Sequence, residues 1–144
     1  AYEQELTEVR KRAQALARLK ARDKLVKAKN KIVDDFYLTL SQELKQLAAA
    51  DYLNFLVKVL NSRRQFGGEV VLGKEDSQLG EELIKKANKM AGKEVFTLSR
   101  ETHSLDRGLI LKQDRVSENL TIDELIRQFR QQTEVFVAKE LFSD

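Results

Sequence analysis

The chain has 144 residues, of which 34% are charged, with a formal net charge of +3, one histidine and no proline, cysteine or tryptophan. The absence of cysteine excludes disulfides, thiolate catalysis and cysteine-ligated metal sites, and one histidine leaves little material for a histidine-based centre. The sequence contains no run of 18 or more apolar residues, which is the length needed to span a membrane, so we expect a cytoplasmic protein. Because the chain begins at Ala1 rather than at methionine, we also expect a truncated or processed front.

Glycine and charge are both distributed unevenly. All six glycines follow Phe66, so the first 66 residues contain neither of the two residue types that most often interrupt regular structure. Residues 1–33 hold ten Lys or Arg against four Asp or Glu, whereas residues 34–144 hold sixteen against nineteen. This pattern predicts a helical, basic front half that leads into a mildly acidic body. The basic charge points to an anionic partner near the N-terminus.

Residues 1–48 are rich in Ala, Leu, Lys, Arg, Gln and Glu, which predicts an extended helical arm. The arm carries too little apolar surface to form a core alone, so we expect it to pair with a partner helix or to self-associate. An alternative row, Leu6, Ala17 and Ala28, has an eleven-residue spacing and leaves the hand of the supercoil open. The partner-binding seam that we favour repeats every seven residues at Leu19, Val26, Val33, Leu40 and Leu47.

Residues 49–144 predict an α+β globular head. A richer apolar helix runs from Tyr52 to Phe66 and is ended by Gly67 and Gly68. Thr121 is expected to cap the last helix, with Glu124 at the capping-box position. The elements expected between them are a strand at 69–72, a helix at 78–91 capped by Asp76 or Ser77, a strand at 94–98, a polar loop at 99–107 and a hairpin of 109–112 with 116–120.

Two motifs suggest chemistry and neither is convincing. The segment from Gly68 to Lys74 has the spacing of a phosphate-binding loop, but Glu75 stands where a magnesium-binding hydroxyl is needed, so a strand between turns is the better interpretation. His103 lies between Thr102 and Ser104, and a hydrolase would depend on it alone. We therefore predict no catalytic, cofactor-binding or metal-binding residues.

The basic segment at residues 10–31 leaves a second function class open. Cationic helices bind nucleic acid or anionic membranes by releasing counterions from phosphate. The segment has no aromatic residue on which bases could stack. A nucleic-acid-binding protein or another basic coiled-coil adaptor is therefore the alternative to a helix that pairs with a partner protein.

The order of parts resembles the E subunit of the V-type and A-type rotary ATPases, which is their peripheral-stalk or stator component. The resemblance extends over the whole chain, although family members usually have a longer N-terminal helix. Its features are the long charged helix, the apolar helix ending at Gly67-Gly68, the strand at 69–72, the strand Gly108-Leu109-Ile110-Leu111, Val116 with Glu118-Asn119, and the ending Ala138-Lys139-Glu140-Leu141-Phe142.

The resemblance implies a non-catalytic subunit without a cofactor. In this family the long helix pairs with the helical G subunit, which is called F or H in some bacterial complexes. The C-terminal domain attaches to the N-terminal region of the B subunit in the catalytic head, and the other end of the stalk reaches the cytoplasmic arm of the membrane subunit. The implied role is to resist rotor torque during ATP-coupled ion transport, at the periphery of a membrane-bound complex.

Overall fold

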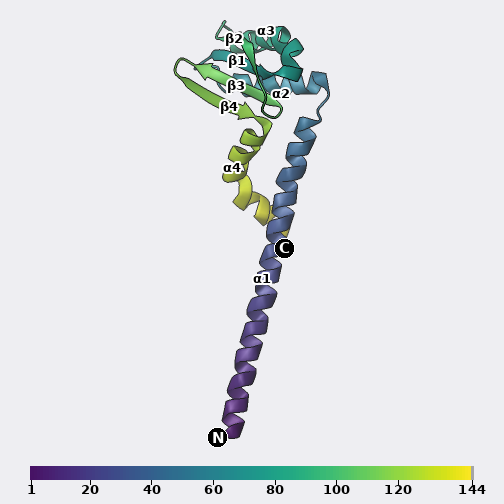
Figure 1. Cartoon of the computed structure of the whole chain (residues 1–144), viewed down its shortest axis with the longest axis vertical. Coiled ribbons are helices and arrows are strands. Elements are labelled where there is room, and N and C mark those ends of the chain that lie inside the picture. The colour runs from purple at the N-terminus through teal and green to yellow at the C-terminus, as the bar shows by residue number, and fades with distance from the viewer. Residues whose placement is uncertain (144) are drawn as a thin grey trace. The chain divides into compact units, whose positions relative to one another are not determined.

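A computed structural model describes residues 1–143 and shows an α+β chain (Figure 1). None of its helices is both long enough and apolar enough to cross a bilayer within these residues. The elements in chain order are α1 (Tyr2–Lys45), α2 (Ala49–Asn61), β1 (Gly68–Gly73), the 3-10 helix η1 (Lys74–Leu79), α3 (Gly80–Ala91), β2 (Phe96–His103), β3 (Gly108–Gln113), β4 (Val116–Thr121) and α4 (Ile122–Phe142).

Helix α1 is continuous over 44 residues, as its composition predicts, and would be about 66 Å long at 1.5 Å per residue. It ends at Lys45, three residues before the predicted boundary at residue 48. No glycine or proline ends it. Instead Leu47 packs against a buried core cluster, and the Arg107 guanidinium binds the carbonyl groups of Lys45 and Leu47, so contacts distant in sequence stop the helix.

By its internal contacts the chain divides into two compact units. The first, unit 1, contains residues 1–38 and 133–143, and the second, unit 2, contains residues 39–132. This division differs from the arm at 1–48 and head at 49–144 that the sequence predicts.

In unit 1, the last turns of α4 lie antiparallel to α1. The Tyr37 and Thr133 hydroxyls share a hydrogen bond of 2.7 Å, and the Lys29 ammonium lies 5.3 Å from the ring centroid of Phe142. Val33 lies one turn from both Lys29 and Tyr37 on the same side of α1 and is only 5% exposed. The sequence patterns did not predict this pairing within the chain.

Unit 2 contains a four-stranded mixed sheet with the order β2-β1-β3-β4. Strand β1 pairs parallel with β2 and antiparallel with β3, and β3 and β4 form the predicted hairpin. In the hairpin turn Asp114 adopts a φ of 55°. The register aligns Leu72, Leu109 and Leu120 on one face of the sheet, and all three are nearly inaccessible to solvent.

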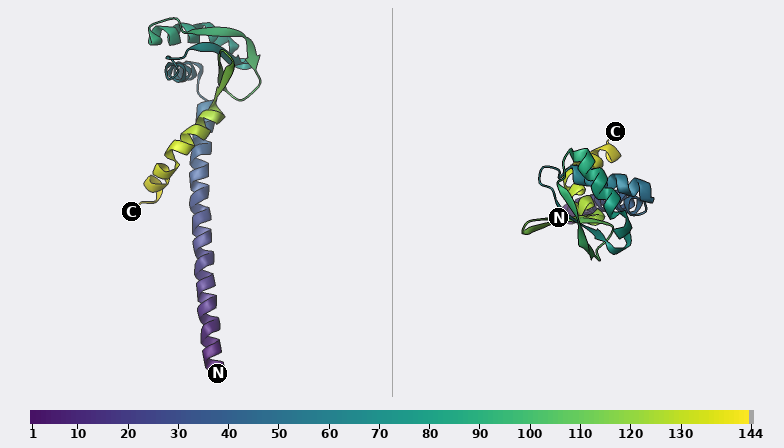
Figure 2. Two further views of the ribbon diagram at one scale, coloured as in Figure 1. Left: turned by 90° about the vertical axis from the view of Figure 1, so that its left-hand side faces the viewer. Right: turned by 90° about the horizontal axis from the view of Figure 1, so that it is seen from above.

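Helices α2 and α3 cover that face (Figure 2). The predicted helical spacing on α2 places its apolar side in the core, where Tyr52, Leu56 and Leu60 are fully buried. Leu83 and Ala87 from α3 complete the same cluster. The predicted core of the head is therefore confirmed, and α2 is shorter than expected because residues 62–66 form turns rather than helix.

Three local predictions are wrong. Strand β2 runs from Phe96 to His103, through most of the segment predicted as a polar loop. Neither Asp76 nor Ser77 caps α3, since both lie in the 3-10 helix that precedes it. Thr121 ends β4, and its hydroxyl donates to Asn119 Oδ1 at 2.7 Å rather than accepting from the first turn of α4.

Candidate interaction surfaces

The surface best suited to bind a partner is the first part of α1. Residues 2–28 are exposed on every side of the helix. Of the predicted seam, Leu19 is 57% exposed and Val26 is 49% exposed. A helix with exposed apolar side chains gains most of its stability from packing against another element, so this stretch is suited to a second helix.

The remaining residues of the predicted seam have other environments. Val33 is buried in unit 1, Leu40 is half-buried, and Leu47 lies beyond the end of α1 and packs against the core of unit 2. The structure therefore leaves Leu19 and Val26 as the part of this row that a partner could reach. Their role in partner binding stays a prediction.

A second apolar row on α1 also faces solvent. Leu25, Ile32 and Phe36 recur at spacings of seven and four, which places them on one side of the helix, and each is between 41% and 56% exposed. Ala28 shares this side with Leu25 and Ile32, so the row continues the eleven-residue alternative from the sequence. Two adjacent rows of α1 thus compete as a partner seam.

Positive charge accompanies these rows. Residues 10–31 contain ten Lys or Arg and a single acid, Asp23. The ion pair that the structure shows in this region joins Arg12 to Glu8 at 4.0 Å, with both side chains more than 70% exposed. Exposed ion pairs of this kind contribute little to stability, so an acidic partner could replace this one at little cost. The basic charge of residues 10–31 is therefore available to such a partner.

The end of α1 is held by Arg107, a residue that no sequence pattern singled out. Its Nη1 donates to the carbonyl oxygens of Lys45 at 2.9 Å and Leu47 at 2.7 Å. Its guanidinium stacks 3.6 Å from the ring centroid of Tyr52, and its Nε lies 3.9 Å from Asp76 Oδ1. One side chain from the β2–β3 connection therefore joins the end of α1, helix α2 and η1.

Beneath Arg107, the Tyr52 hydroxyl donates to Asp76 Oδ2 at 2.9 Å. Burial, with the adjacent Asp76 carboxylate, raises the pKa of Tyr52 well above its ordinary value. The phenol therefore stays protonated and keeps its hydrogen bond at physiological pH. A phenol that holds its proton this tightly is a poor acid, and its hydrogen bond joins α2 to η1.

A second set of contacts joins α1 to the start of α4. The Lys45 ammonium lies 2.6 Å from Asp123 Oδ1 and 3.9 Å from Asp106 Oδ2. Ser41 also donates to Asp123, and the Asp123 backbone N–H donates to Asp106. The hydrogen bond from Lys45 lowers the pKa of Asp123. Together with the contacts of Arg107, these bonds form what we call the α1 anchor.

The two chemical motifs from the sequence lie in ordinary secondary structure and a loop. Residues 68–73 form strand β1, as the strand interpretation of this segment predicts. His103 Nε2–H donates to the Gly108 carbonyl at 2.8 Å, and its Nδ1 accepts from the Leu105 N–H, so the ring closes a loop instead of facing a nucleophile. In the described part of the chain, no three acidic or histidine side chains gather closely enough to hold a metal ion.

Comparison with known proteins gives similarity to one component of the V-type ATPases, their E subunit. The chain is 25% identical to one such protein of the V-type ATP synthase of Clostridium tetani over 127 residues, which is 85% of this chain. It is also 25% identical to the V-type proton ATPase E subunits of Clostridium botulinum and Finegoldia magna, over 88% and 86% of this chain. No model of a known protein family matches the sequence.

These matches cover 64%, 66% and 62% of the three relatives, so the chain spans somewhat less than two thirds of their length. The similarity agrees with the resemblance found in the sequence and extends across both units of the structure.

Proposed function

We propose that the chain is a non-catalytic peripheral-stalk component of a V-type or A-type rotary ATPase, equivalent to the E subunit. The observation that carries this proposal is the similarity to several E subunits over more than four fifths of the chain. In this role α1 pairs with a G-type helical stalk protein, and unit 2 attaches to the B subunit of the catalytic head. The far end of the stalk meets the cytoplasmic arm of the membrane subunit.

The exposed rows on α1 support pairing with a helix. An apolar surface on α1 is not covered by any other part of the described chain. It is formed by Leu19, Leu25, Val26 and Ile32. The surrounding lysines and arginines favour a partner whose flanking positions are acidic. Pairing would bury the apolar rows and limit bending of the exposed part of α1. A load-bearing stalk requires this stiffness.

The α1 anchor supports the mechanical part of the proposal. A stator must pass torque between its helix and its head, and a flexible linker there would absorb the motion. Arg107 and Lys45 instead tie the last turn of α1 to α2, to η1 and to the start of α4. The break in the helix after Lys45 is thus bridged by directional bonds.

The test is co-expression of the full chain with a G-type stalk protein, followed by light scattering and circular dichroism. We expect a complex with the mass of one copy of each chain. The double variant Leu19→Lys/Val26→Lys should weaken it by at least about 100-fold, because each buried apolar contact is worth about 1.5–3 kcal/mol. The variant Ala17→Lys/Ala28→Lys adds the same charge to the competing row.

The two variants separate the possible seams. Loss of the complex with the first variant alone supports the seven-residue seam, whereas loss with the second alone moves the interface to the eleven-residue row. A chain that forms no complex with the G-type protein, or two variants that bind as tightly as the wild type, would refute helix pairing through α1.

A further inference from the structure

Strand β2 forms one edge of the sheet. Its inner side pairs with β1, where the Gly68 N–H donates to the Val95 carbonyl at 2.9 Å. Backbone groups alternate along a strand, so Phe96 and Leu98 direct their N–H and C=O groups to the outer edge. Such an edge can accept another strand.

Asn88 of α3 already occupies the first position of this edge. Its Oδ1 accepts from the backbone N–H groups of Val95 and Phe96 at 3.1 and 2.9 Å, and its Nδ2 donates to the Phe96 carbonyl at 3.0 Å. The carboxamide therefore stands where the peptide group of a neighbouring strand would stand. Within residues 1–143 the outward backbone groups of Leu98, the next position, have no hydrogen-bond partner.

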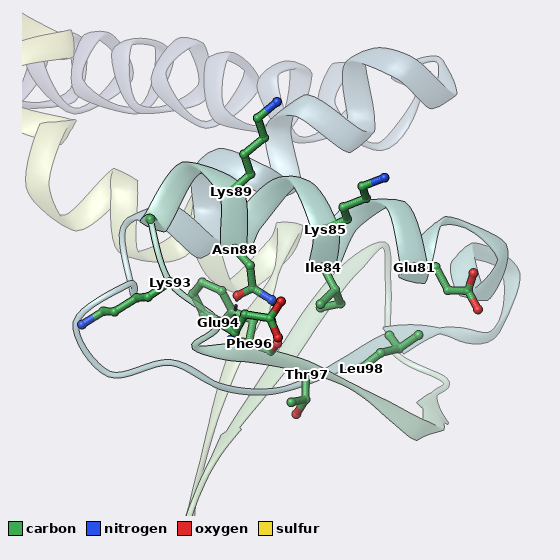
Figure 3. Close-up of a pocket in the computed structure, with 11 residues that line it drawn as sticks. Glu81, Ile84, Lys85, Asn88, Lys89, Lys93, Glu94, Phe96, Thr97 and Leu98 are labelled. Atoms are coloured by element: carbon green, nitrogen blue, oxygen red, sulfur yellow. Dashed lines mark hydrogen bonds between the residues drawn. The ribbon is translucent and has the colours of Figure 1, made fainter.

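A groove of about 860 Å³ runs between α3 and β2 beside these groups (Figure 3). Ile84 points from α3 toward the strand, and Leu98 is 38% exposed. Near the start of α3, a methyl group added to Gly80 would lie 2.6 Å from Leu98 Cδ2, so helix and strand approach closely there. The groove thus offers apolar contacts beside a free strand edge, the combination that an extended peptide needs.

The charge of the groove selects among occupants. Lys85, Lys89 and Lys93 line it, and none has an ion-pair partner among the described residues. Glu81 and Glu94 are the acids in its lining, which leaves it net positive. A second copy added at this edge would bring two sets of lysines together, and lysines beside an edge strand oppose such self-pairing. An acidic chain has the complementary charge.

We propose that the groove between β2 and α3 binds an extended acidic peptide segment of a partner protein, which adds to the sheet as a strand at Leu98. The segment would continue the edge from the Asn88 carboxamide, place alternate apolar side chains on Ile84 and Leu98, and direct its acids to the lysines. This binding mode rests on unit 2 alone and does not depend on the stalk role of α1.

The test is an NMR titration of the full chain with a capped hexapeptide that alternates glutamate and valine. We expect the amide signals of Thr97, Leu98 and Ser99 to shift, and the Leu98 amide to exchange more slowly with solvent. The variant Lys85→Glu/Lys89→Glu should weaken binding at least about fivefold. The matched variant Lys58→Glu/Lys74→Glu makes the same charge change away from the groove and should alter affinity less than about twofold.

A second peptide, N-methylated at alternate positions, keeps the charge and loses the donors that pair with a strand edge. Binding that is abolished by methylation supports strand addition, whereas equal binding of both peptides would show attraction by charge alone and overturn it. The proposal also fails if Leu98 is unshifted at millimolar peptide. It fails equally if Leu98 shifts with protein concentration alone, which would make a second copy the occupant.

Discussion

Replacing Arg107 with methionine should loosen the α1 anchor and destabilise unit 2. Methionine keeps the aliphatic packing but removes the bonds to the carbonyls of Lys45 and Leu47, the stacking on Tyr52 and the charge beside Asp76. A hydrogen bond from a charged donor contributes about 1.5–3 kcal/mol, and a cation–π contact contributes about 1 kcal/mol. Because Arg107 is 23% exposed and water can replace part of its bonding, we expect a loss of about 3 kcal/mol.

The loss is measured by urea unfolding, followed through the NMR methyl signals of Leu109 and Leu120, which report the core of unit 2 and not the exposed part of α1. With a slope of about 1.5 kcal/mol per molar urea, the midpoint should fall by about 2 M. Arg107→Lys keeps the charge but lacks the planar guanidinium, so its urea midpoint should lie about halfway between those of the wild type and Arg107→Met. Arg115→Met, at the exposed hairpin turn, is the matched control and should change stability by less than about 0.5 kcal/mol.

A midpoint for Arg107→Met that matches the Arg115→Met control would refute the reasoning. It would mean that solvent satisfies the carbonyls at the end of α1 as well as the guanidinium does, so that Arg107 contributes nothing to the anchor.

Three further predictions concern unit 2. Gly108→Ala should cost at least about 2 kcal/mol, since φ is 127° and the new Cβ would lie 2.5 Å from a backbone atom of β4, whereas Gly92→Ala, with a φ of 78° and open space, should cost about 1 kcal/mol. The lowered pKa of Asp123 means that its ion pair with Lys45 stabilises the fold above about pH 4–5 and is lost as pH falls through the folded pKa. The wild type should therefore be more stable than Asp123→Asn by about 0.5–1 kcal/mol at about pH 7, and the stabilities of the two proteins, measured by thermal unfolding, should converge as pH falls through the folded pKa of Asp123. Asn88→Ala should cost about 2 kcal/mol and speed amide exchange at the first residue of β2, and unchanged exchange there would contradict the bonding that we describe.

Sequence periodicity predicted the elements whose stability comes from one apolar face. Helix α2, strand β1 and the hairpin of β3 with β4 lie close to their expected positions, because their apolar residues pack in the core in the order that the pattern implies. Strand β2 was misassigned at its C-terminal half for a physical reason. As an edge strand with solvent on one side, its segment from Ser99 to Thr102 needs no apolar side chains, so its composition is that of a loop.

Contacts between distant segments could not be read from the sequence. The hydrogen bond of Tyr37 with Thr133 joins residues 96 positions apart, and nothing local to either residue indicates it. Val33, one turn from Tyr37, is only 5% exposed, although it has the same spacing as the exposed Leu19 and Val26. Spacing alone gives the side of a helix on which a residue lies, while exposure depends on which segment covers that side.

The end of α1 shows the same limit with a functional consequence. The change of apolar pattern near residue 48 predicts that one helix gives way to another there, but no glycine or proline marks where α1 ends, and the chain leaves the helix after Lys45 and begins α2 at Ala49. A helix without a breaking residue stops there because Leu47 gains burial in the core and Arg107 satisfies the carbonyls that the next turn would have used. In the proposed stalk role, load at this break passes through the backbone of residues 46–48 and the packing of Leu47, and the bonds of Arg107, Lys45 and Ser41 add to the stiffness of the junction.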